Sequence, residues 1–302
     1  MSGWTADRES GSSELALGFL ADLERWIATD TSPAAPELRA ALLAWLRAAQ
    51  AAQPTMAIVH QLAARALAVA DAGLPRGDRP VDLRARLAEA CESERRDLGA
   101  AREAVARTAA ALVTERGGWI ATLSASASVH AAFLEAQRAG RAPRALVAEA
   151  RPRLEGRVLA ASLAAAGIPV WLVVDAALPL LLTHAAMVWL GADAATEAGV
   201  VNKVGSLAAA LAAREHSVPC YALPGRRKFL PAATPALRIV EMPPGEVWDS
   251  PAPGVQPRNV YFELVPMALL RGIVVEDGVL GATEAATLAR ERPLPAELAG
   301  AP

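Results

Sequence analysis

The most constraining feature of the sequence is a change of periodicity near residue 115. Before this point, apolar residues recur at the three- and four-residue spacing of amphipathic helices, and no segment shows a strand pattern. After Gly117-Gly118, short apolar runs alternate with alanine-rich segments. Such alternation is typical of a parallel sheet built from βαβ units. The sequence therefore predicts an α/β fold, with a helical N-terminal domain at residues 1–114 and a sheet domain at residues 115–302.

The individual elements follow from this division. In the first domain, helices are expected over residues 12–30, 36–52, from 54 onward and over 81–114, and residues 1–12 are expected to be disordered. In the second domain, three apolar runs follow a proline, at positions 143, 169 and 219, which a strand tolerates at its start. Further strands are expected at 119–123, 187–190, 260–264 and 272–275, with a helix at 128–138, a proline-rich loop at 241–258 and a tail from about residue 292.

The stretch 191–206 concentrates polar groups at the end of an expected strand. Asp193 stands just beyond the strand, and Asn202-Lys203 precede an alanine-rich helix that opens at Ser206. In open α/β sheets, ligands bind outside the carboxyl ends of the strands, and a helix N-terminus favours anions. An acid, an ammonium group and a helix start together predict a pocket for a small phosphorylated molecule. The alternative is a solvated loop between a strand and a helix.

Two other strands of the predicted sheet also end in an acid, at Glu149 and Asp175. Parallel strands place their carboxyl ends on one rim of a sheet. Glu149, Asp175 and Asp193 are therefore expected to line the same side of it. For Asp175 the alternative is an N-cap of the alanine-containing segment that follows.

Basic residues near this rim are candidates for binding phosphate. Of the 30 lysines and arginines, only Lys203 and Lys228 are lysines, and both are expected in loops on the rim. The compact ammonium of lysine binds ligands differently from the planar guanidinium of arginine. The alternative is that the two lysines fall at these positions by chance. Arg151, Arg153 and Arg157 lie in the turn after Glu149, where they either bind phosphate oxygens or form a solvated basic turn. Of these, Arg151 and Arg157 are the candidate phosphate ligands.

Composition and missing motifs disfavour several classes of function. The net charge of -2 and the pI of about 6.1 argue against broad binding to nucleic acid. The chain has no Gly-x-Gly-x-x-Gly, Walker A or Gly-x-Ser-x-Gly motif, and no cofactor is expected. Four scattered histidines and two cysteines show no metal-ligand spacing, so no metal site is expected.

The apolar stretch 168–190 has the length of a membrane span, but Asp175, Pro179 and His184 interrupt it. Two buried strands flanking a short helix explain it better. The N-terminus shows no apolar run after a basic start, as a signal peptide has. The protein is therefore expected to be cytoplasmic and to have no contact with membranes.

A set of short motifs recurs along the chain in a characteristic order and spacing. The motifs are Pro-Thr-Met-Ala at 54–57, Glu-Ala-Arg-Pro-Arg-Leu-Glu-Gly-Arg at 149–157, Gly-Ile-Pro-Val at 167–170, Gly-Ala-Asp at 191–193, Gly-Val-Val-Asn-Lys-Val-Gly at 199–205 and Lys-Phe at 228–229. Together they resemble one superfamily, which contains the alpha, beta and delta regulatory subunits of eukaryotic translation initiation factor 2B, ribose-1,5-bisphosphate isomerase and methylthioribose-1-phosphate isomerase. The resemblance covers residues 115–280 best.

The resemblance has implications for fold, assembly and site. It implies that the second domain is Rossmann-like, that the site lies between the two domains, and that the chain forms a homodimer or a larger homo-oligomer. It also implies that Asp193 moves protons in an aldose–ketose isomerisation. Asn202 and Lys203 match a pair that helps to hold the substrate, and Lys228 lies in a matching Lys-Phe segment that here lacks the family's preceding acid and tyrosine.

The main departure from the isomerases concerns a cysteine in the turn after the first strand. That position falls at about Ser126, in the hydroxyl-rich turn 122–128, which is itself a candidate anion site. A serine hydroxyl is a much weaker acid than a thiol. Two hypotheses therefore stay open. The chain is an isomerase of a phosphorylated ribose, with Asp193 and Ser126 as catalytic residues, or it is a non-catalytic regulatory subunit or sensor of sugar phosphates or nucleoside monophosphates.

Overall fold

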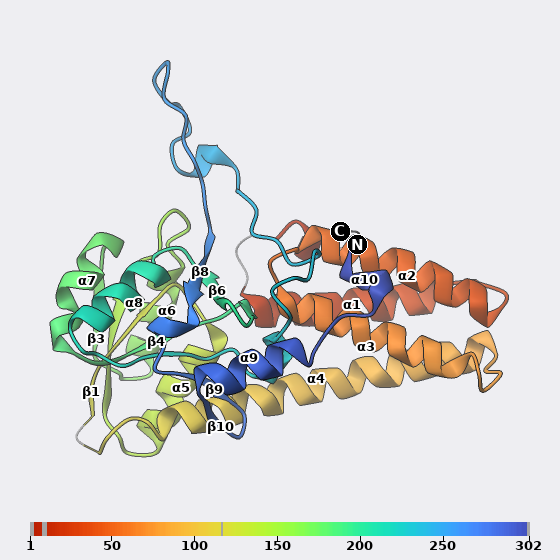
Figure 1. Cartoon of the computed structure of the whole chain (residues 1–302), viewed down its shortest axis with the longest axis horizontal. Coiled ribbons are helices and arrows are strands. Elements are labelled where there is room, and N and C mark those ends of the chain that lie inside the picture. The colour runs from red at the N-terminus through yellow and green to blue at the C-terminus, as the bar shows by residue number, and fades with distance from the viewer. Residues whose placement is uncertain (1–2, 8–10, 116, 301–302) are drawn as a thin grey trace.

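The helical and the sheet-containing regions lie next to each other along the long axis of the molecule (Figure 1). The computed structural model describes residues 3–7, 11–115 and 117–300. No strand lies among the described residues before β1 (Gly118–Leu123), as the sequence predicts. The first region contains the four long helices α1 (Ser12–Thr29), α2 (Ala35–Ala52), α3 (Ala57–Gly73) and α4 (Pro80–Ala110).

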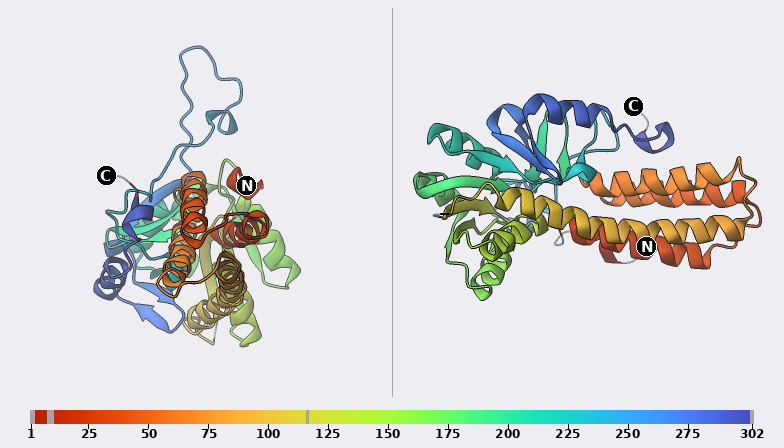
Figure 2. Two further views of the ribbon diagram at one scale, coloured as in Figure 1. Left: turned by 90° about the vertical axis from the view of Figure 1, so that its right-hand side faces the viewer. Right: turned by 90° about the horizontal axis from the view of Figure 1, so that it is seen from below.

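These four helices pack through the apolar faces that their periodicity predicts. Their shared core buries leucines such as Leu15, Leu38 and Leu83. α4 is longer than its neighbours and runs out of this bundle into the second region (Figure 2). There its residues Val105 and Ala109 enter the core beneath the sheet. One continuous helix therefore connects the two regions.

The second region is built on a seven-stranded sheet with the order β10-β9-β7-β4-β1-β2-β3. All pairings are parallel except that of β9 with β10. Beside it lies a small antiparallel sheet of β5 (Ala194–Ala195), β6 (Gly199–Lys203) and β8 (Phe262–Pro266). The remaining strands of the large sheet are β2 (Pro143–Ala148), β3 (Val170–Val173), β4 (Ala185–Leu190), β7 (Cys220–Ala222), β9 (Gly272–Val275) and β10 (Gly278–Leu280).

Helices cover both faces of the large sheet, which confirms the predicted α/β architecture. α5 (Ala127–Arg138) and α6 (Glu155–Ala165) pack with the end of α4 on one face, and α7 (Leu178–Leu181), α8 (Ser206–Glu215) and α9 (Ala282–Arg290) pack on the other. In the sheet, strands β2 and β3 lie on one side of β1, whereas β4 and β7 lie on its other side. Such a switch point between two strands is where open α/β sheets bind ligands. The short 3-10 helices are η1 (Gly3–Thr5), η2 (Asp175–Ala177), η3 (Leu182–His184), η4 (Arg226–Lys228), η5 (Pro244–Glu246) and η6 (Met267–Leu269).

The two ends of the chain are more ordered than the sequence predicts. The expectation of disorder over residues 1–12 is wrong for η1, where Trp4 is buried and donates a 2.7 Å hydrogen bond to Asp22; residues 1–2 and 8–10 lie outside the described part. The expected tail contains α10 (Ala296–Ala299), whose Leu298 is buried in the core of the helical bundle. In both segments a few apolar residues pack against distant helices, which local sequence does not reveal.

The apolar stretch 168–190 also differs in part from its prediction. β4 is buried as expected, but β3 is the edge strand of the sheet, and its Trp171 and Leu172 are 42% and 46% exposed. The proline-rich segment 241–258 is a loop, as predicted, and Figure 1 shows it extending away from the body of the protein.

Candidate functional site

A cavity of about 400 Å³ opens where β1 and β4 end, at the switch point of the sheet. Its wall is formed by the turn from β1 into α5, by residues 191–193 after β4, by the end of β6, by η4 and by the first turn of α1. The helical region therefore helps to enclose a pocket that lies mainly at strand ends. Among the residues that line it are Ser126, Asp193, Asn202, Lys203 and Lys228.

Asp193 is held between β6 and the helical region by its main chain. Its N–H donates a 2.8 Å hydrogen bond to the oxygen of Val201, and its own oxygen accepts a 3.0 Å bond from the N–H of Ala57 in α3. Burial raises the pKa of the Asp193 carboxyl, and the positive charges of Lys228 and Lys203 oppose this shift. Such a carboxyl can take up and release a proton closer to neutral pH than an exposed aspartate can.

Lys228 is buried beside Asp193. Its Nζ donates 2.6 Å hydrogen bonds to Ser12 Oγ and to the main-chain oxygen of Ala192. Burial lowers the pKa of the Lys228 ammonium, and the charge of Asp193 opposes this shift. Ser12 also bonds to Asp193 through its side chain. An acid, a hydroxyl and an amine from three distant parts of the chain therefore form one coupled group.

Ser126 and Asn202 both lie close to Gly191 in the wall of the cavity. Ser126 is the N-cap of α5, and its Oγ accepts a 3.4 Å bond from Val129 N. Asn202 Nδ2 donates a 2.8 Å bond to Ser206 Oγ. Gly191 lies between them, because a Cβ at this position would be 2.9 Å from Ser126 Cβ and 3.1 Å from Asn202 Oδ1. Only glycine permits this approach without displacement of a neighbour.

Lys203 is the last residue of β6 and is buried, so the expectation that it lies in a loop is wrong. The alternative of a solvated loop is wrong for the same reason. Its Nζ lies 2.5 Å from Glu155 Oε1 and 4.2 Å from the centroid of the Tyr261 ring. The second oxygen of Glu155 is buried and has no hydrogen-bond partner in the described ranges. The positive charge of Lys203 is therefore paired with the carboxylate of Glu155 at one side of the cavity.

The turn between β2 and α6 carries the three arginines that the sequence offers for binding phosphate, and one of them borders the cavity. Arg151 and Arg157 do not line the cavity. Arg157 is exposed and donates a 2.7 Å bond to Glu149 Oε2. Arg153, in the same turn, lines the cavity instead. The cis peptide bond before Pro152 belongs to this turn.

Of the three acids expected on one rim, only Asp193 lines the cavity. Asp175 accepts bonds of 2.8 and 2.7 Å from the main-chain N–H groups of Ala150 and Arg151. It therefore stabilises the neighbouring turn, and it is not the N-cap of the segment that follows it. Glu149 is paired with the exposed arginine described above.

The anion site expected at the start of α8 is occupied by a side chain of the protein itself. Glu263 Oε1 accepts bonds of 2.7 and 2.8 Å from the N–H groups of Gly205 and Leu207. A carboxylate there uses the same N–H groups and helix dipole that a phosphate would use. The N-terminus of α5, in contrast, borders the cavity through residues 124–127.

Several residues of the cavity wall could not be identified from the sequence. They include Ser12, Glu155 and the pair His130–Ser162, in which His130 Nε2 lies 2.9 Å from Ser162 Oγ. Burial and the charge of Arg102 lower the pKa of His130. His130 stands four residues after Ser126, so helical spacing offers a signal for it, whereas Ser12 is distant from the motifs and offers none.

Over the described ranges, no three side chains of histidine, cysteine, aspartate or glutamate gather closely enough to hold a metal ion. None of the helices in these ranges combines the length and the hydropathy that a membrane span needs.

The sequence profile of the Initiation factor 2 subunit family (IF-2B) matches residues 8–282. The chain belongs to this family. The family assignment confirms the resemblance seen in the motifs. It also agrees with the position of the cavity, because Gly-Ala-Asp and Asn-Lys, two of the matching motifs, both border it.

Similar IF-2B proteins divide between initiation-factor-like chains and isomerases. A putative translation initiation factor eIF-2B subunit 2-like protein of Pyrococcus furiosus is 32% identical over 182 residues, covering 60% of this chain and 63% of that protein. A methylthioribose-1-phosphate isomerase of Synechococcus sp. strain CC9605 is 36% identical over 163 residues, covering 50% of this chain and 48% of the isomerase. A ribose 1,5-bisphosphate isomerase of Methanocaldococcus jannaschii is 34% identical over 137 residues, or 44% of each chain. The chain thus spans less than two thirds of the length of each of these relatives.

Solved structures share the fold over most of the chain. The translation initiation factor eIF-2B of Pyrococcus horikoshii OT3 superposes with a TM-score of 0.76 at 26% identity, covering 92% of this chain and 94% of that one. The 5-methylthioribose 1-phosphate isomerase of the same organism gives a TM-score of 0.74 at 20% identity, covering 95% of this chain and 84% of that one. At this identity the second match shows the fold alone.

Proposed function

We propose that this IF-2B protein binds a small phosphorylated pentose in the cavity and interconverts its aldose and ketose forms, with Asp193 moving the proton. The observation that carries the proposal is a buried carboxyl of raised pKa beside a buried ammonium in one cavity. Aldose–ketose isomerisation transfers a proton between the two carbons C1 and C2. It needs a group that accepts this proton and returns it.

The charges of the cavity support a phosphorylated ligand. Lys203, Lys228 and Arg153 lie in its wall, together with the N-terminus of α5. Ammonium groups, guanidinium groups and helix N-termini all bind phosphate oxygens. Two relatives are named as isomerases of methylthioribose-1-phosphate and of ribose 1,5-bisphosphate, which supports a phosphorylated pentose as the ligand.

The residues that line the cavity take distinct roles in this proposal. Asn202 and Lys203 hold the sugar, and Lys228 keeps a positive charge beside the reacting carbons. Arg153 replaces Arg151 and Arg157 as the arginine that binds phosphate, because it borders the cavity and they do not.

A non-catalytic role is the second candidate, and the state of Ser126 favours it. In the described ranges the hydrogen-bond partner of its Oγ is the main-chain N–H of Val129, and no carboxylate or imidazole bonds to it. A hydroxyl without a base beside it is a poor substitute for a thiolate. In this role the chain binds a sugar phosphate or a nucleoside monophosphate as a sensor or regulatory subunit.

We further propose two domains, at residues 1–114 and 115–302, and a homodimer or larger homo-oligomer formed through the second. The exposed Trp171 and Leu172 on edge strand β3 supply apolar surface for such a contact. Sedimentation equilibrium of the whole chain tests the assembly, and a monomer at all concentrations would contradict it.

The decisive experiment separates binding from turnover. Titration calorimetry with ribose-1,5-bisphosphate, methylthioribose-1-phosphate and nucleoside monophosphates measures binding, and NMR of the same sugars follows their conversion to ketoses. Binding with conversion supports the isomerase. Binding without conversion supports the sensor or regulatory subunit, and absence of binding by every compound contradicts both.

A further inference from the structure

The cavity of about 400 Å³ that contains Asp193 is called the main cavity below. The turn that carries Lys228 is held in place by residues outside this main cavity. Both oxygens of the Glu276 carboxylate, in the turn between β9 and β10, accept bonds from the main-chain N–H of Arg226, at 3.1 and 2.9 Å. Glu276 does not line the main cavity. It lines a neighbouring cavity of about 190 Å³, whose wall also includes Lys228. Its carboxylate therefore acts on the main chain two residues before Lys228.

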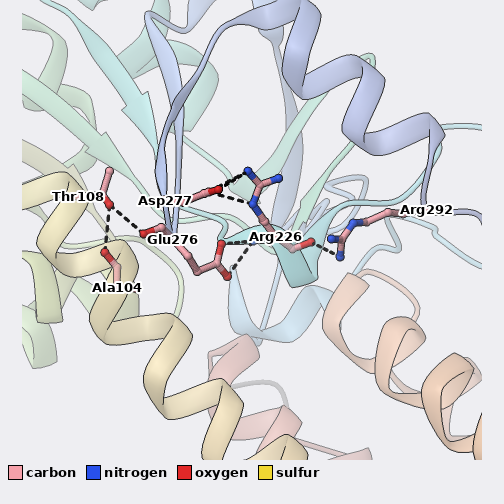
Figure 3. A network of polar contacts seen from close by, with 6 residues as sticks. All are labelled: Ala104, Thr108, Arg226, Glu276, Asp277 and Arg292. Atoms are coloured by element: carbon pink, nitrogen blue, oxygen red, sulfur yellow. Dashed lines mark hydrogen bonds and ion pairs between the residues drawn. The ribbon is translucent and has the colours of Figure 1, made fainter.

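Two further contacts of Arg226 hold the same turn in place. Figure 3 shows the guanidinium of Arg226 paired with Asp277, at 2.8 Å between Nη2 and Oδ1, and the oxygen of Arg226 accepting a 3.0 Å bond from Arg292 Nη1. The Asp277 side chain is 66% exposed, so solvent competes for this pair. The bond from Glu276 to the main chain is the better shielded of the two, because Glu276 is half-buried whereas Asp277 is exposed.

Glu276 is itself anchored to the long helix that joins the two regions. Thr108 Oγ1 in α4 donates a 3.2 Å bond to the main-chain oxygen of Glu276 and lies 3.1 Å from the oxygen of Ala104 (Figure 3). One residue beyond Arg226, Arg227 donates a 3.1 Å bond to Asp97, also in α4. The turn is therefore held against α4 on one side and against the sheet on the other.

We propose that Glu276 is a positioning residue, which holds the turn 225–229 so that the Lys228 ammonium points into the main cavity. The effect that Glu276 is expected to have on ligand binding rests on the proposed function. A carboxylate that accepts from a main-chain N–H forms a charge-assisted bond, stronger than one to a neutral amide. Loss of its charge loosens the turn and lets Lys228 leave Ser12 and Ala192, which accept its hydrogen bonds.

The test uses the fact that the chain has only two lysines, Lys203 and Lys228. Amine acetylation by an N-hydroxysuccinimide ester, followed by mass spectrometry of peptides, measures the reactivity of each lysine separately. In Glu276→Gln, we expect Lys228 to react about tenfold faster, the factor expected for loss of one charge-assisted hydrogen bond. Lys203, on the other side of the cavity, should keep its rate and serves as an internal control.

The matched control is Asp277→Asn, which removes the same charge one residue away but leaves the main-chain bond of Arg226 intact. It should leave the Lys228 rate unchanged. If Glu276→Gln does not fold, Glu276→Asp retains the charge on a shorter side chain and should raise the Lys228 rate above that of wild type by less than tenfold. Equal Lys228 rates in a folded Glu276 variant and wild type, or an equal rise in Asp277→Asn, would overturn the proposal.

Ligand titration separates this inference from the proposed function. If wild type binds a pentose phosphate, Glu276→Gln should weaken binding about tenfold, with Asp277→Asn unchanged. If wild type binds none of the pentose phosphates, the proposed function fails, and the acetylation rates still decide whether Glu276 positions Lys228.

Discussion

Lys228 Nζ donates a 2.6 Å hydrogen bond to Ser12 Oγ, although 216 residues separate the two in the chain. Ser12 begins α1, and Lys228 lies in the turn after β7. Gly11 lies against the turn that precedes α5, since a Cβ on it would be 3.8 Å from the oxygen of Ala125. The start of α1 therefore forms part of the site, and the site is complete only when the helical region is docked.

This contact predicts that Ser12→Ala weakens ligand binding. The variant leaves a buried ammonium with one fewer acceptor, and the cost of an unmade bond to a charged group is about 1–3 kcal/mol. We expect the affinity for a pentose phosphate to fall by about tenfold. Ser13→Ala is the matched control, because Ser13 lines the cavity but makes no bond to Lys228 within the described ranges. Calorimetric titration of both variants measures the difference, and equal affinities would contradict the assigned role of Ser12.

Gly191→Ala should disturb the site by steric conflict. The new Cβ would lie 2.9 Å from Ser126 Cβ, so Ser126 or the strand end must move. Overpacking of this kind costs about 1–3 kcal/mol. We expect a lower unfolding free energy in urea and weaker ligand binding. Gly99→Ala is the control, because nothing lies within 4 Å of its Cβ position and alanine favours a helix by about 0.5–1 kcal/mol. A Gly191 variant as stable as wild type would contradict the tight approach.

His60 should make the stability of the protein depend on pH. It is buried, with Nδ1 2.9 Å from Gln50 Nε2 and Nε2 3.1 Å from the oxygen of Pro54. Burial lowers the pKa of His60 from 6.5 to about 4. The unfolded chain therefore takes up this proton first as the pH falls, and stability that is complete above pH 6.5 is lost progressively towards pH 4.

At pH 5 this loss amounts to about 2 kcal/mol, since one unit of pKa difference corresponds to about 1.36 kcal/mol. Urea unfolding at pH 7.5 and pH 5 measures it. His60→Gln cannot titrate and should show a smaller change between the two pH values. His216→Gln, at an exposed histidine, should behave as wild type does. An identical pH dependence in His60→Gln would exclude this residue as the cause.

The parts of the fold that are local in sequence could be predicted. A proline at the start of a strand and an acid directly after one depend on neighbours within a few residues, so β2 and the place of Asp193 followed from the sequence. Ser12 and Glu276 could not be found in this way, because their roles depend on contacts with a turn that is distant in the chain. Local spacing also could not separate Arg153 from Arg151, since backbone geometry decides which of the two lines the cavity.

The role of Asp193 is tested by Asp193→Asn. The amide keeps the size of the side chain but cannot accept a proton from carbon, so we expect turnover to fall below detection while pentose phosphate binding is largely retained. In wild type, kcat/KM should rise with pH through the pKa of Asp193, which burial holds above its ordinary range. NMR conversion assays and calorimetry on the same preparations measure both quantities. Turnover that survives in Asp193→Asn would assign the proton transfer to another group.

Ser126→Cys tests whether the missing thiol limits the reaction. Ser126 is the N-cap of α5, and a thiol at a helix N-terminus has a lowered pKa and so more of the reactive thiolate. Positioned acid–base groups contribute about a hundred- to ten-thousand-fold each, so an enzyme without the thiol should be slow and the variant faster. Ser124→Cys, at a cavity residue two positions earlier, is the control and should not raise the rate. If wild type binds the sugars without turnover and Ser126→Cys restores none, the isomerase proposal fails and the sensor or regulatory role stands.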